Sequence, residues 1–121
     1  MLYGMKLKPD AEKLHNSCAV LDGDDPKLLD WLEDSQISAL IADNFAIEDA
    51  RIQRPPDYVG PRLPIHNKCL FKLGVPLGEL WYLEELTTWL SKKQRFRFLL
   101  TAPPLRLSGA VGSPVTPVAT V

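Results

Sequence analysis

Residues 25–44, DPKLLDWLEDSQISALIADN, predict a helix that is followed closely by a buried strand. Asp25 is a residue type that caps helices and Pro26 fits the first turn, so we expect the helix over residues 26–34. Its apolar stripe is formed by Leu28, Leu29 and Leu32. Residues 37–42, ISALIA, indicate the strand. A helix and a strand with a short connection are typical of α/β proteins.

A second helix is expected after a long surface loop. The loop covers residues 50–64, which are rich in proline. The helix is expected to begin near His66 and to end at Gly74, a natural C-cap. Helical spacing places four of its residues on one face: His66, Cys69, Leu70 and Leu73. We therefore expect His66 to point inward with this apolar face.

The C-terminal part of the chain predicts one more helix and one or two strands. The helix is expected over residues 83–91, and residues 95–100, RFRFLL, indicate a strand. Residues 105–118 are compatible with a further strand and a tail. We expect the strands at 37–42 and 96–100 to belong to one sheet on which the helices pack.

Length and composition are those of an ordinary globular protein. The 121 residues, 45% hydrophobic and 24% charged with a net charge of -1, predict a single domain over residues 1–121. No basic field for nucleic acid is present, and no apolar run approaches the ~20 residues of a membrane span. Two cysteines without a signal peptide do not indicate a disulfide framework. We expect a cytoplasmic protein whose residues 1–20 are poorly ordered.

The residues that carry chemistry are few. The sequence lacks phosphate-binding, dinucleotide-binding and nucleophile-elbow motifs, and it contains only two histidines. His66 is the stronger candidate, because a helix N-terminus favours a neutral imidazole with a free lone pair. The chain turns back after Gly74, so Glu79 is expected to return to within about 8 Å of His66, the reach of one metal ion.

Spacing alone leaves simpler alternatives open. His66 could be a helix-start histidine bound to backbone, and Glu79 an early-helix carboxylate favoured by the dipole. Asp43 and Glu48 follow a buried strand, where α/β proteins place site loops. They could equally be an ordinary polar strand end and a loop carboxylate.

Several ordered blocks of the sequence resemble the C-terminal half of the cyclase-family metal-dependent hydrolases, which include kynurenine formamidases (arylformamidases). The blocks are residues 29–48, 63–66 (LPIH), 73–81 (LGVPLGELW), 83–86 (LEEL) and 102–115 (APPLRLSGAVGSPV). Together the resemblance covers residues 21–118. It implies part of a three-layer β/β/α fold of the swivelling-domain type, with a mixed sheet and helices on one face.

The resemblance also implies a function. In this family the histidine at the position of His66 and the glutamate at the position of Glu79 are ligands of a divalent metal, usually zinc or manganese. The family cleaves amide bonds, such as that of N-formylkynurenine in tryptophan catabolism. No residue is assigned a catalytic or further cofactor-binding role.

The sequence departs from the family in one large respect. The family motif H-x-G-T-H-x-D-x-P-x-H, which supplies the remaining ligands and a proton-transfer histidine, is absent. A catalytic zinc site normally has three protein ligands, so we expect the chain alone neither to retain the metal nor to be active.

Three interpretations follow: a truncated hydrolase, one chain of a split enzyme, or a non-catalytic binding or dimerisation module. Each predicts a homo-oligomer or another partner over the exposed half-domain face, with a small-molecule amide substrate only in a completed enzyme.

Overall fold

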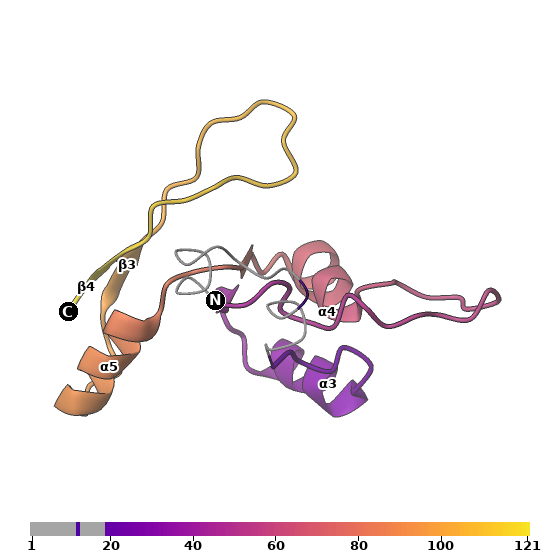
Figure 1. Cartoon of the computed structure of the whole chain (residues 1–121), viewed down its shortest axis with the longest axis horizontal. Helices are drawn as coiled ribbons and strands as arrows, with labels where there is room; N and C mark the ends of the chain where they lie inside the picture. Colours follow the sequence, from indigo (N-terminus) through magenta and orange to yellow (C-terminus); the bar gives the residue numbers. More distant parts are fainter. Residues whose placement is uncertain (1–11, 13–18) are drawn as a thin grey trace. The chain divides into compact units, whose positions relative to one another are not determined.

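The computed structural model describes residue 12 and residues 19–121 of the chain. The chain divides into two compact units, Met1–Tyr82 and Leu83–Val121 (Figure 1). The expectation of poor order in residues 1–20 falls almost entirely outside the described residues, and the single domain over residues 1–121 stays a prediction.

The helix expected over residues 26–34 has the bounds that the sequence predicts. Helix α3 spans Pro26–Asp34. The side chain of Asp25 caps it by accepting a hydrogen bond of 2.9 Å from the backbone N–H of Lys27. Leu32, in the expected apolar stripe, is buried. The helix prediction is confirmed at both ends.

The second helix begins earlier than predicted and changes its winding. Helix α4 spans Pro64–His66 and continues as the π-helix η1 over Asn67–Leu73. Gly74 ends η1 in the left-handed region with φ 69°, so the predicted C-cap is confirmed. The chain before α4 is the predicted long loop, which Figure 1 shows reaching away from the helix.

The expectation that Leu70 shares the buried face of this helix is wrong. Leu70 is 51% exposed, whereas Ile65 and Cys69 are fully buried. The buried residues recur at every fourth position of the chain, whereas Leu70 directly follows Cys69 and is turned to a neighbouring face of the helix, which is exposed. The buried stripe is therefore Ile65, Cys69 and, partly buried, Leu73.

The chain then returns and pairs with the strand after α3. Strand β1 is Leu40–Ile41 and strand β2 is Leu77–Gly78. Of the strand expected over residues 37–42, only residues 40–41 are confirmed. The two strands are parallel, with Leu40 opposite Leu77. This pairing places the chain that follows each strand at the same end of the sheet.

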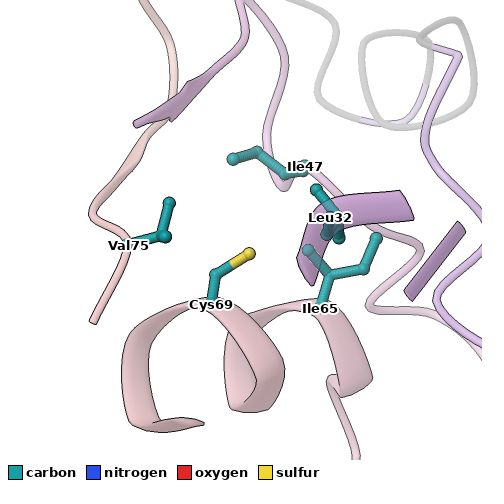
Figure 2. Close-up of a cluster of buried hydrophobic side chains, with 5 residues drawn as sticks. All are labelled: Leu32, Ile47, Ile65, Cys69 and Val75. Carbon is teal, nitrogen blue, oxygen red and sulfur yellow. The ribbon is translucent and has the colours of Figure 1, made fainter. Parts of the chain in front are cut away.

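A small hydrophobic core holds these elements together. Figure 2 shows its buried side chains, which come from α3, the loop after β1, the second helix and the chain after Gly74: Leu32, Ile47, Ile65, Cys69 and Val75. Leu32, Ile47, Ile65 and Cys69 are exposed by 2% or less. Their burial fixes the residues next to them, among which the candidate site lies.

The second unit holds one helix and one strand pair. Helix α5 spans Glu84–Lys93. Strands β3, Leu99–Thr101, and β4, Val118–Thr120, are antiparallel (Figure 1). The helix expected over residues 83–91 is confirmed, and the strand expected near residue 100 is present but shifted toward the C-terminus.

The expectation of one sheet shared by these strands is wrong, because β1 pairs with β2 and β3 with β4 in two separate two-stranded sheets. The partner of β1 is only two residues long, Leu77–Gly78, and carries no alternating pattern that could reveal it. The fold class is accordingly a small mixed α/β arrangement. None of the helices that the structure describes has the length and apolar character needed to cross a membrane.

Candidate metal-ligand site

The ring of His66 lies between two carboxylates of the first unit. Its Nδ1 atom is 2.8 Å from Oε1 of Glu48, and its Nε2 atom is 3.3 Å from Oε1 of Glu79. The three residues come from the loop after β1, from α4 and from the residue after β2. Each nitrogen of the imidazole ring thus contacts a carboxylate oxygen.

Glu48 is the most deeply buried of the three, with a side chain 2% exposed. Its Oε2 accepts a hydrogen bond from the backbone N–H of Ile65 at 2.9 Å, and its Oε1 accepts one from that of His66 at 2.7 Å. Helix α4 has no side-chain cap from its own N-cap residue, Leu63. Glu48 satisfies these first-turn donors instead, from eighteen residues away in the chain.

Glu79 is placed by the turn that follows β2. Its Oε1 accepts a hydrogen bond of 3.0 Å from the backbone N–H of Ile47. The next residue, Leu80, has φ 61°, in the left-handed region that residues other than glycine rarely adopt. Its N–H is held by the carbonyl of Asn44 at 3.2 Å. The turn is therefore tied to the loop after β1, and it fixes the carboxylate beside His66.

The spacing of His66 and Glu79 suits two ligands of one ion. Atoms bound at about 2.1 Å to a tetrahedral metal lie about 3.4 Å apart. The Nε2 of His66 and Oε1 of Glu79 are separated by 3.3 Å. Imidazole nitrogen and carboxylate oxygen are both zinc ligands, and carboxylates also suit manganese. These two residues fit part of a divalent-metal site.

The part of the chain that the structure describes offers no group of three or more histidine, cysteine, aspartate or glutamate side chains arranged around one ion. Glu48 faces the other ring nitrogen, so it does not act as the third ligand. A complete site would need further donors.

The predicted approach of Glu79 to His66 is confirmed, since their side chains lie well within 8 Å. The simpler alternatives do not describe the structure: the His66 ring contacts carboxylates, and Glu79 precedes α5, which begins at Glu84. Asp43 is exposed, as an ordinary strand-end residue would be. The roles of His66 and Glu79 as metal ligands stay predictions.

The burial of Glu48 was not predicted, since its position after the strand also suits an ordinary loop carboxylate. The signal that could have revealed it is the run Ala46-Ile47-Glu48, in which both apolar neighbours are also buried. A carboxylate that directly follows buried apolar residues is itself drawn into the core and must find hydrogen-bond donors there. Here it finds them at the start of α4.

The chain is similar to a solved structure described as that of a novel cyclase. The two are 36% identical with a TM-score of 0.64, over 80% of this chain and 29% of the other. This chain therefore spans less than a third of that protein's length. No protein-family profile and no curated protein matches the chain. The likeness supports the cyclase family as the class of protein, and it does not resolve a finer identity.

Proposed function

We propose that this chain carries part of the active centre of a cyclase-family, metal-dependent hydrolase that cleaves amide C–N bonds, as arylformamidases do. In this proposal His66 Nε2 and Glu79 Oε1 are two ligands of a zinc or manganese ion. The observation that carries it is the 3.3 Å separation of these atoms, at the spacing of ligands of one ion. A bound divalent ion supplies Lewis acidity and a water activated for attack on the amide.

The chain's own residues hold and orient this centre. Glu48 contacts the other ring nitrogen of His66, Nδ1, and the Ile47 N–H donates to the Glu79 carboxylate. Two carboxylates lie against one imidazole ring, an arrangement that suits a bound cation. In the completed enzyme this half would belong to a three-layer β/β/α fold.

The remaining ligands must come from outside the described residues, and we propose that a partner supplies them. The second unit shows large apolar side chains to solvent, including Phe96, Leu99 and Val118. Exposed apolar surface of this kind is typical of protein interaction sites. A second copy of the chain, or a chain that carries the missing histidines and aspartate, would cover it.

The alternative is a non-catalytic binding or dimerisation module. The same exposed apolar residues favour this alternative, since they need a partner whether or not chemistry follows. The two functions differ in what His66 does. An interaction module does not need the imidazole to bind a metal.

Complementation tests the proposed function. The chain would be co-expressed with an N-terminal segment of a cyclase-family hydrolase that carries the H-x-G-T-H-x-D-x-P-x-H motif, and assayed with N-formylkynurenine and zinc or manganese. We expect no turnover by the chain alone and metal-dependent turnover by the complex. His66→Ala and Glu79→Gln should abolish it, and His15→Ala should not. A complex that turns over equally well with His66→Ala would contradict the proposal.

A further inference from the structure

The carboxylate of Glu48 is fixed before it meets the ring of His66. Its two oxygens accept the backbone N–H groups of two successive residues, Ile65 at 2.9 Å and His66 at 2.7 Å. Both donors belong to the first turn of α4, where the helix dipole favours a negative charge. The position of Oε1 is therefore set by the backbone and not by the imidazole.

The contact between this oxygen and the ring of His66 bears on which ring nitrogen carries the proton. An ionised carboxylate only accepts hydrogen bonds. Oε1 lies 2.8 Å from Nδ1, so an ionised Glu48 would take a hydrogen bond from Nδ1–H. In a singly protonated ring, Nε2 then keeps its lone pair. We propose that Glu48 is a positioning residue, which holds His66 in the Nδ1–H tautomer and aims Nε2 at the position shared with Glu79.

Glu79 faces the opposite nitrogen and would favour the opposite tautomer. Two observations decide between the carboxylates. The contact to Glu48 is shorter, 2.8 Å against 3.3 Å, and its side chain is 2% exposed against 25% for Glu79. With Nδ1 unprotonated, a lone pair would face the Glu48 oxygen where no solvent could relieve the repulsion. Glu79 is partly solvated, so the same conflict there is weaker.

Gly23 belongs to the same arrangement. A Cβ atom at residue 23 would lie 2.1 Å from Oε2 of Glu48 and 3.2 Å from Cδ of Pro64. The missing side chain therefore leaves the space in which the carboxylate meets the start of α4. The positioning unit consists of Gly23, Glu48 and the first turn of α4.

The positioning role of Glu48 rests on the proposed function, because that function makes a metal ion the ligand of His66. A carboxylate that orients a histidine is a common support of metal sites. The tautomer itself can be measured without metal. In the His15→Ala variant, long-range 1H–15N spectra report one ring, that of His66. We expect the Nδ1–H pattern for the singly protonated ring. The Nε2–H pattern would overturn the proposal.

Substitutions separate positioning from stability. Glu48→Gln keeps one acceptor oxygen but presents N–H groups to the donors on its other side. We expect mixed tautomers and zinc affinity, measured by equilibrium dialysis, lowered about 10–100-fold. Asp25→Asn is the matched control, because Asp25 caps α3 and should alter neither readout. If Glu48→Gln keeps the Nδ1–H tautomer and full zinc affinity, the positioning role is wrong.

The two proposals fail in different ways. An Nδ1–H ring in a protein whose zinc binding is unaffected by His66→Ala would support the role of Glu48 and contradict the metal site. If Glu48→Gln does not fold, the tautomer of the wild-type ring still decides the positioning role.

Discussion

The Nε2 atom of His66 lies 3.3 Å from the Oε1 atom of Glu79, across a chain path of thirteen residues. The path is built from local signals: η1 runs away from His66, Gly74 ends it in a left-handed conformation, and β2 returns alongside β1. A carboxylate and an imidazole meet at the spacing of two metal ligands because the helix end and the strand pair fix both ends of this path.

Gly23→Ala is expected to destabilise the first unit. The added methyl group would lie 2.1 Å from Oε2 of Glu48. That buried carboxylate accepts two backbone N–H groups, one on each oxygen, and cannot move freely. Overpacking of this kind costs about 1–3 kcal/mol. Urea denaturation measures it, with Gly112→Ala as control because nothing lies within 4 Å of that position. Equal effects of the two substitutions would contradict the close packing around Glu48.

Truncation of Ile65 and of Leu70 should differ sharply, although both belong to the second helix. Ile65 is fully buried and Leu70 is 51% exposed. Ile65→Ala should therefore lower the free energy of unfolding by about 2–5 kcal/mol. Leu70→Ala should cost less than about 1 kcal/mol, since little apolar area is lost. A cost at Leu70 as large as that at Ile65 would contradict the exposed position of Leu70.

The substitution Gly74→Ala measures the cost of a strained backbone conformation without a steric clash. Gly74 has φ 69°, and no atom lies within 4 Å of the position that a Cβ would take. The cost, about 1–2 kcal/mol, should come from the left-handed conformation alone. Gly74→Asn should cost less, because asparagine tolerates this region better than alanine. Thermal or urea unfolding of both variants checks the order, and an unchanged Gly74→Ala protein would contradict it.

Cys69 should be unreactive in the folded protein. Burial raises the pKa of its thiol, and the charge of Glu48 adds to this effect. Less thiolate forms at a given pH, so alkylation by iodoacetamide should require unfolding. Because the unfolded thiol ionises first, stability should also fall as the pH rises above about 8.5. Mass spectrometry of a Cys18→Ser variant, with and without denaturant, measures the alkylation; rapid labelling without denaturant would contradict burial.

Local signals predicted much of this structure. Asp25 and Pro26 gave the start of α3, and Gly74 gave the end of the second helix, because caps act within one turn. The approach of Glu79 to His66 followed from the same turn. These features depend on neighbours in the chain, which a sequence displays directly.

Features set by tertiary contacts were not predictable in the same way. The partner of β1 is a two-residue strand, and Leu70, next to the buried Cys69, is turned outward. Glu48 resembled an ordinary loop carboxylate because its partners, the N–H groups of α4, lie seventeen and eighteen residues away. Its burial depends on the packing of the core around it, which no short pattern encodes.

Zinc binding to the chain itself tests the central claim, that His66 and Glu79 form part of a metal site. Equilibrium dialysis would compare the wild type with His66→Ala and Glu79→Gln, and His15→Ala and Glu85→Gln would serve as controls. We expect weak binding by the wild type, since the described residues do not complete a site of three ligands. His66→Ala and Glu79→Gln should each lower the affinity at least about tenfold, and the controls should not. Equal zinc binding by the wild type and both site variants would contradict the account.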